Sequence, residues 1–289
     1  MNKFFICSFI LCILLSACKK EETKSPSYNS GEMTILTDDS FLSVTQALAD
    51  GYMMNYPDTK IEVKSRKEDL AFLDLLNDKS RVIVMSRELQ PNEINEYEKQ
   101  VELKYQPAKF AADAVVFVVP KGSQLKQLTL EEIASGLKSK TRPFIFDGTN
   151  SSNLNFIAQY FNEKPKNLEF SIINGNENLI ENLRQHPSKI GVIGYNAISR
   201  PYDKKSQQLR DQIEILPIVV KGKSYQPDLN QLKSMEYPFT RVLYFLVNES
   251  GFNLANGFIR FSCTQIGQKI VEKEGLQPYN LYGREVQMR

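Results

Sequence analysis

Short apolar runs alternate with amphipathic helical segments from residue 33 onward in this 289-residue chain. Residues 82–85 (Val-Ile-Val-Met) are all apolar and mostly β-branched, as is typical of a buried strand, whereas 41–52 carries apolar side chains at helical spacing. Parallel neighbouring strands need a long crossover, which is usually a helix. The alternation therefore predicts an α/β fold with mixed, mainly parallel sheets.

The pattern predicts where the individual elements lie. We expect strands at 33–36, 60–64, 81–85, 114–119, 143–146, 170–173, 190–195, 213–220 and 241–247. We expect helices at 41–55, 68–76, 91–99, 153–161, 177–184 and 253–274. A further helix is expected to start at 129–132, where Thr129 offers a cap and Glu131 and Glu132 an acidic first turn. Ser40 is placed to cap the first of these helices.

The first eighteen residues have the features of an export signal. Lys3 gives a positive start, and residues 4–17 form an apolar run too short to span a bilayer, which takes ~20 residues. The run ends in Leu15-Ser16-Ala17-Cys18, which is similar to the lipobox of bacterial lipoproteins. We expect cleavage after the signal peptide (1–17), lipid on Cys18 and a polar tether over 18–32. An ordinary signal peptide with a chance cysteine is the alternative.

Composition excludes several function classes. One His rules out a multi-histidine zinc site, and we expect no metal and no cofactor. Lys+Arg number 36 against 34 Asp+Glu, so no basic surface for nucleic acid is expected. No Gly-x-Ser-x-Gly elbow occurs in the sequence. We therefore predict a protein that is not an enzyme.

Three junctions after predicted strands share one chemical character. Each offers hydroxyl or amide donors, exposed backbone N–H groups and a helix N-terminus, which together suit an anion. In chain order, the candidate ligand-binding residues are Asp39, Ser40, Phe41, Ser86, Arg87, Asp147, Asn150, Ser151, Ser152 and Asn153. Taken singly, each Ser or Asn is also explained as an ordinary helix cap, and Arg87 as a surface ion-pair partner.

The order of segments resembles the PstS-like phosphate-binding components of bacterial ABC importers over nearly all of residues 33–289. The most specific matches are to the family patterns Y-P-L-T-R and G-Q-x-I-V. They are carried by Tyr237-Pro238-Phe239-Thr240-Arg241 and Gly267-Gln268-Lys269-Ile270-Val271. Further matches are Ser86-Arg87-Glu88-Leu89, the strand 114–119 with the helix start after Leu128, Asn150-Ser151-Ser152-Asn153 and Ile190-Gly191-Val192-Ile193-Gly194-Tyr195.

The resemblance implies two lobes that close on an oxyanion. Lobe 1 would comprise 33–112 and 239–289, and lobe 2 would comprise 113–238. It places Ser40, Ser86 and residues 151–153 at the ligand. The family arginine that precedes its Ser-Gly-Thr segment is missing here, where residues 144–147 read Phe-Ile-Phe-Asp. We hypothesise that Arg87 supplies the charge and that Asp39 or Asp147 accepts a proton from the ligand.

The predicted function is that of a lipid-anchored solute-binding protein that captures phosphate or a related oxyanion for an ABC importer. Its expected partners are the oxyanion, the importer permease and, through Cys18, a membrane of the cell envelope. We expect a monomer that binds no nucleic acid. The alternative is a cell-surface interaction or sensor lipoprotein that keeps the fold but not phosphate binding.

Overall fold

The computed structural model describes residues 27–280, so the signal peptide and Cys18 lie outside the described residues. Strands and helices alternate in a mixed α/β fold, which confirms the predicted fold class. Among the described residues, no helix has both the length and the apolar character needed to cross a membrane.

One mixed sheet organises the molecule. Its main strands lie in the order β2-β1-β3-β12-β4-β8-β6-β7, and β9 and β13 pair with β4 off this path. These strands are β1 (Gly31–Thr37), β2 (Thr59–Ser65), β3 (Val82–Met85), β4 (Ala108–Pro120), β6 (Phe144–Phe146), β7 (Ser171–Ile172), β8 (Ile190–Gly194), β9 (Ile213–Ile215), β12 (Thr240–Val247) and β13 (Gln277–Pro278). A smaller sheet joins β5 (Leu128–Thr129), β10 (Ile218–Val220) and β11 (Lys223–Tyr225).

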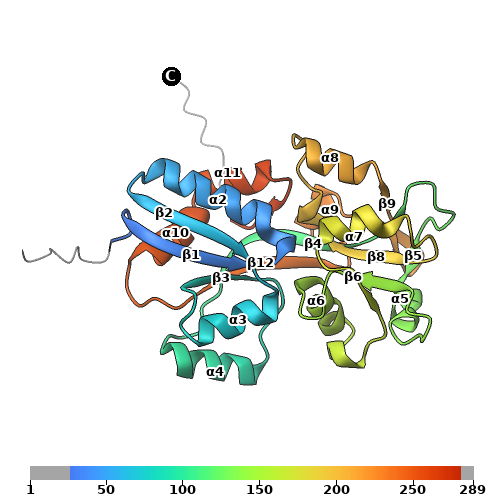
Figure 1. The fold of residues 1–289 in the computed structure, drawn as a ribbon, viewed down its shortest axis with the longest axis horizontal. Coiled ribbons are helices and arrows are strands. Elements are labelled where there is room, and N and C mark those ends of the chain that lie inside the picture. The colour runs from blue at the N-terminus through green and yellow to red at the C-terminus, as the bar shows by residue number, and fades with distance from the viewer. Residues whose placement is uncertain (1–26, 281–289) are drawn as a thin grey trace, which may run out of the picture.

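Helices cover both faces of the sheet, as Figure 1 shows. In its left half they are α2 (Leu42–Asn55), α3 (Glu68–Leu76), α4 (Pro91–Val101), α10 (Leu254–Ser262) and α11 (Gln265–Lys273). In its right half they are α5 (Leu130–Gly136), α6 (Ser152–Tyr160), α7 (Asn176–Leu183), α8 (Lys204–Arg210) and α9 (Leu229–Lys233). Residues 27–280 also contain three short 3-10 turns: η1 (Asp39–Phe41), η2 (Pro165–Asn167) and η3 (Tyr195–Ala197).

Strand direction differs between the ends and the middle of the main sheet. At one end β1 pairs in parallel with β2 and β3, and at the other β6 pairs in parallel with β7 and β8. In the middle, β12 and β4 are antiparallel to their neighbours. The parallel pairs are those joined through helices, and the two long central strands connect the two ends.

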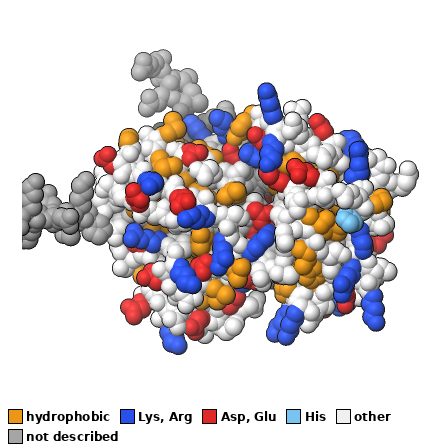
Figure 2. Space-filling model, in the orientation of Figure 1, with side chains coloured by type: hydrophobic (Ala, Val, Ile, Leu, Met, Phe, Trp, Pro, Cys, Tyr) orange, Lys and Arg blue, Asp and Glu red, His pale blue; other side chains and the backbone are white. Residues whose placement is uncertain are grey.

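The buried apolar residues divide into two groups that meet at β4. One cluster contains only residues from 114–239, and we call this half lobe 2. Two further clusters, on opposite faces of the other half of the sheet, contain residues from 33–111 and 243–276, and we call that half lobe 1. Because β4 contributes to both sides, the lobes share a continuous strand. Acidic and basic side chains are intermingled over the face drawn in Figure 2.

Three local expectations need correction. The predicted helix 253–274 is two helices, because Thr264 accepts from Gly267 N and caps a new start. The predicted strand 213–220 is split into β9 and β10. Pro217, which lacks an N–H, lies between them. Ser40 does not cap α2, whose N-cap is Phe41; it lies instead inside the 3-10 turn 39–41, which Asp38 caps by accepting from the backbone N–H of Ser40 at 3.0 Å.

Candidate functional site

Loops that follow strands of both lobes meet where the lobes join. Asp38, Asp39 and Ser40 follow β1, and Lys67 follows β2, all in lobe 1. From lobe 2, Asp147 follows β6, Ser152 and Asn153 begin α6, and Asn176 begins α7. Hydrogen bonds and ion pairs link these eight residues, which we call the central cluster.

Lys67 is the cation of the central cluster. Its Nζ forms ion pairs with Asp39 and, at 2.9 Å, with Asp147 of the opposite lobe. The side chain is 22% exposed. Burial alone would lower the pKa of Lys67, but the nearby Asp38, Asp147 and Asp39 outweigh it and raise that pKa above its ordinary value. Lys67 therefore stays charged and joins the lobes.

Two carboxylates of lobe 1 accept hydrogen bonds from backbone N–H groups at the N-termini of two helices of lobe 2. Asp38 accepts from Ser152 N at 3.1 Å, in the first turn of α6. Asp39 accepts from Asn176 N at 2.9 Å and from its side-chain amide at 2.7 Å, at the start of α7. A helix N-terminus is a ready-made position for an anion. Here the protein's own carboxylates take up that position.

Neutral side chains fill the space between the charged groups. The Ser40 hydroxyl accepts from the side-chain amides of Asn153 and Asn176, both at 3.0 Å. Asn153 also donates to Asp147 at 3.0 Å, and Gly194 N donates to the Asn176 side-chain oxygen at 3.0 Å. The Ser152 hydroxyl and the Asn153 side-chain oxygen are buried without a hydrogen-bond partner among residues 27–280. The polar side chains of the cluster thus bond mainly to one another, and these two oxygen atoms remain able to form further hydrogen bonds.

The three aspartates titrate differently. Burial, followed by repulsion from Asp39 and Asp147, raises the pKa of Asp38 to about 7. Burial likewise raises the pKa of Asp147, although Lys67 opposes the shift. For Asp39, burial is outweighed by Lys67 and Asn176, and its pKa is lowered. Asp38 consequently holds an exchangeable proton near neutral pH, while Asp39 is ionised.

The same carboxylates form the one acidic set within residues 27–280 close enough together to hold a metal ion. Oxygens of Asp38, Asp39 and Asp147 lie within 4.8 Å of one another. The Lys67 ammonium already pairs with two of them, so the charge that an ion would supply comes from within the chain.

The structure places Ser86 and Arg87 in a second polar group. Ser86 donates to Glu68 from its backbone N and its hydroxyl, at 2.7 and 2.8 Å. Arg87 binds Glu93 through two 2.8 Å hydrogen bonds and Asp69 through one of 3.1 Å. Burial alone would lower the pKa of Arg87, but these carboxylates raise it. The Arg87 guanidinium therefore faces carboxylates of its own group, and Lys67 is the cation beside Asp39 and Asp147.

The other predicted residues have mainly structural contacts. The Phe41 ring is buried and lies 4.5 Å from the Arg241 guanidinium. Ser151 caps α6 and donates to Gly148 O at 3.1 Å. Asn150 is half-buried, and its carbonyl accepts from Asp69 N at 3.5 Å. Thus Asp39, Ser40, Asp147, Ser152 and Asn153 come together, with Phe41, Asn150 and Ser151 beside them.

Comparison with known proteins identifies the superfamily. The family model described as "PBP superfamily domain" matches residues 22–265. The chain belongs to the PBP superfamily. The relatives named below are described as phosphate-binding proteins or as components of phosphate transport, and not as enzymes.

Individual PBP relatives agree with the resemblance to the PstS-like group. "Phosphate-binding protein PstS" of Borreliella burgdorferi is 23% identical over 301 residues, which covers 95% of this chain and 98% of that protein. A putative phosphate ABC transporter substrate-binding protein from Clostridium perfringens, solved with bound phosphate, is 20% identical. The structural match covers 86% of this chain and 99% of the Clostridium perfringens chain, with a TM-score of 0.69. An ABC-type phosphate transport receptor from Vibrio cholerae is 15% identical and has a TM-score of 0.63. The match covers 85% of this chain and 99% of the receptor chain. These low identities describe a divergent member.

Sequence reasoning missed three members of the central cluster of this PBP protein: Asp38, Lys67 and Asn176. Each follows a β-strand at the edge where ligands bind in α/β sheets, so position alone could have indicated them. Lys67 lies in a charged stretch, Arg66-Lys67-Glu68-Asp69, that is typical of a solvated helix start, so the sequence pattern does not distinguish it from a surface lysine. Its fully buried ion-pair partner, Asp147, comes from the opposite lobe.

Proposed function

We propose that this chain is a lipid-anchored solute-binding protein of the cell envelope that captures phosphate, or a related oxyanion, for an ABC importer. The observation that carries the proposal is the meeting of Lys67 with the N-termini of α6 and α7 at the junction of the lobes. An ammonium group and helix N-termini both attract an oxyanion. The phosphate-binding relatives support the same solute.

Binding at this point requires an exchange of acceptors. The oxyanion would replace the Asp38 and Asp39 carboxylates at Ser152 N and Asn176 N, and would pair with Lys67. Protonated Asp38, whose pKa is raised to about 7, would then donate to an oxyanion oxygen. The ionised form would instead repel the ligand, so phosphate should bind more weakly as pH rises through the pKa of Asp38.

The direct test is a thermal-shift and calorimetric titration of the chain from residue 19 onward with phosphate, arsenate, sulfate and an alkylphosphonate. A solute at a hundredfold excess over Kd should stabilise the protein by about 2.7 kcal/mol. Lys67→Met should abolish that stabilisation. The matched control, Lys64→Met, removes an exposed lysine of β2 and should leave it unchanged. Phosphate binding that survives Lys67→Met would contradict the proposed site.

A second candidate function is supported by the carboxylates themselves. Asp38 and Asp39 already satisfy the amides that an oxyanion would use, so the lobes are joined without an external anion. On this alternative the protein keeps the PBP fold and serves as a cell-surface interaction or sensor lipoprotein. The same titration separates the two, because this alternative expects no shift with any oxyanion at millimolar concentration.

The anchor is a separate part of the proposal and rests on the sequence Leu15-Ser16-Ala17-Cys18. Mass spectrometry of the mature protein should find Cys18 as a lipidated N-terminal residue. Cys18→Ser should release the protein from membranes or leave the signal peptide uncleaved. A mature N-terminus at any other residue would contradict the anchor without affecting the solute proposal.

A further inference from the structure

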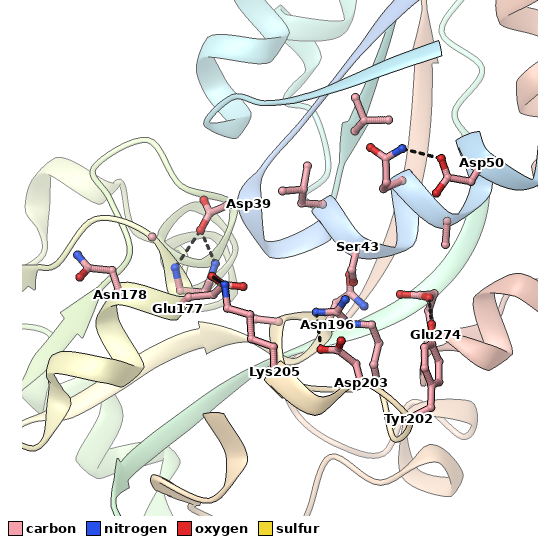
Figure 3. A pocket seen from close by; sticks show the side chains of 18 residues that line it. Asp39, Ser43, Asp50, Glu177, Asn178, Asn196, Tyr202, Asp203, Lys205 and Glu274 are labelled. Atoms are coloured by element: carbon pink, nitrogen blue, oxygen red, sulfur yellow. Dashed lines mark hydrogen bonds and ion pairs between the residues drawn. The ribbon is translucent and has the colours of Figure 1, made fainter. Parts of the chain in front are cut away.

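A pocket of about 760 Å³ opens beside the central cluster, between α2 of lobe 1 and the α7 and α8 region of lobe 2. Figure 3 shows Asp39 at one side of this pocket and Glu274 at the other. Pockets for small organic molecules have volumes of roughly 300–1,000 Å³. The space is therefore suited to a larger ligand than an inorganic oxyanion.

The wall of this pocket is acidic. It carries five carboxylates against two cations: Asp39, Asp50, Glu177, Asp203 and Glu274, against Arg200 and Lys205. Both cations are paired within the wall, Lys205 with Glu177 and Arg200 with Asp203 at 3.4 Å. Within residues 27–280, Asp50 and Glu274 have no salt bridge. The unbalanced charge of the wall is thus negative.

Glu274 is the member that points most directly to a ligand. It is only 3% exposed, and one carboxylate oxygen accepts from the Tyr202 hydroxyl at 2.5 Å. The other oxygen, Oε2, is buried and has no hydrogen-bond partner in the part of the chain that the structure describes. Buried polar atoms are rarely left unpaired, because losing water without a new partner costs free energy.

The position of Glu274 in the chain adds to this cost. It is the C-cap of α11, where the partial negative charge of the helix end disfavours a carboxylate. Burial also raises its pKa, against the opposing effects of Tyr202, Arg200 and Ser43. A cationic donor inside the pocket would relieve both effects. Arg200 Nε, also buried without a partner in the described chain, leaves one donor for a ligand oxygen or a water.

We propose that this pocket binds a small organic cation through a primary ammonium group held by Glu274. The ammonium supplies the N–H donors that Oε2 lacks, and Asp50 adds a second carboxylate to the same wall. This inference goes beyond phosphate capture, because its ligand has the opposite charge and its anchoring residue lies outside the central cluster.

Four-carbon probes that differ in their end groups test the proposal. The chain from residue 19 onward is titrated by calorimetry with putrescine, 4-aminobutyrate, butanediol and succinate. We expect putrescine to bind most tightly and 4-aminobutyrate more weakly, with no binding of butanediol or succinate. Equal binding of putrescine and butanediol, or no binding of putrescine at millimolar concentration, would overturn the proposal. Phosphate is titrated separately, so that its outcome does not affect this one.

Charge-neutral variants locate the interaction. Glu274→Gln keeps the shape of the side chain and an acceptor for Tyr202, and should weaken putrescine binding by at least about tenfold. Its matched control is Glu272→Gln, an exposed residue two positions earlier at the end of the same helix, which should have no effect. If Glu274→Gln fails to fold, Asp50→Asn provides the second variant and should weaken binding severalfold. The assignment is refuted if a folded Glu274→Gln variant binds putrescine with unchanged affinity. The same result for Asp50→Asn refutes it where that variant is the one tested.

Discussion

The central cluster and the Arg241–Asp113 pair each contain a cation paired with carboxylate groups, but they differ in burial and in what they connect. Arg241 on β12 donates to one oxygen of Asp113 on β4 at 2.8 and 3.0 Å, and both side chains are 0% exposed. The two residues belong to paired neighbouring strands. Lys67, by contrast, is 22% exposed and joins loops of different lobes. The first pair belongs to the shared sheet, and the second depends on how the lobes meet.

Gly194 links these two regions. A Cβ at this position would lie 2.7 Å from Ser40 Cβ and 2.9 Å from Arg241 Nη2. Only a residue without a side chain allows the end of β8 to approach both at once. The Arg241–Asp113 pair thus joins neighbouring strands of the shared sheet, whereas the ion pairs of Lys67 join loops of the two lobes.

The largest effect should come from breaking the sheet pair. Arg241→Met leaves Asp113 buried without its cation and should lower the free energy of unfolding by about 3–5 kcal/mol. Urea denaturation measures the change. Adding Asp113→Leu should recover part of the loss, since no buried charge then remains. A loss below about 1 kcal/mol would show that the pair is not the fixed element that the comparison requires.

Removing the cation of the central cluster should have a smaller effect on stability and a larger one on shape. Lys67→Met leaves Asp39 and Asp147 facing each other, and should reduce the free energy of unfolding by about 1–3 kcal/mol. Because the repulsion acts between lobes, small-angle X-ray scattering should detect a larger radius of gyration. Lys64→Met is the control. An unchanged radius would mean that Lys67 does not hold the lobes together.

The pH dependence should come from Asp38. Its pKa is about 7 in the folded protein and 3.8 ordinarily, so between these values the folded state binds more protons than the unfolded state. The stability contribution is therefore complete at low pH and is lost as pH rises toward 7, with a slope of up to about 1.4 kcal/mol per pH unit. Asp38→Asn should flatten the curve measured by chemical denaturation. A curve of the same slope in the variant would assign the titration elsewhere.

The smallest effect should come from an exposed ion pair. Lys60 and Glu32 lie 3.4 Å apart and are 74% and 73% exposed. Lys60→Met should change the free energy of unfolding by less than about 1 kcal/mol, because solvent screens the pair. A larger loss of unfolding free energy would mean that exposed ion pairs stabilise this protein as much as its buried pairs do.

Much of the fold could be predicted from local pattern. The helix 68–76 is found at the predicted residues, and Thr129 caps α5 with Glu132 as its sequence indicates. The wrong boundaries lie where tertiary contacts, rather than local pattern, decide where a helix or strand ends. Periodicity continues through 253–274, yet Gly267 lies against the Phe261 carbonyl, and the chain turns there into a second helix. Pro217 likewise lies between β9, which pairs with β4, and β10, which pairs with β5.

The candidate site shows the same limit. Ser40, Asp147 and Asn153 were identifiable because they follow strands at the ligand-binding edge of an α/β sheet. Arg87 was expected to supply the positive charge, but its nearest acids are Glu93 and Asp69, and Lys67 is the cation beside Asp39. Both are cations near a strand end, so the sequence offers no way to choose between them.

The sequence by itself determined the α/β alternation and the near absence of histidine that rules out a histidine-built metal site. These follow from periodicity and composition, which act locally. The tertiary structure alone decided that carboxylates of lobe 1 meet helix N-termini of lobe 2 and that Lys67 lies between them. Such contacts join residues 114 and 137 positions apart in the sequence. In the low-dielectric junction between the lobes, burial and neighbouring charges set the protonation state of each group.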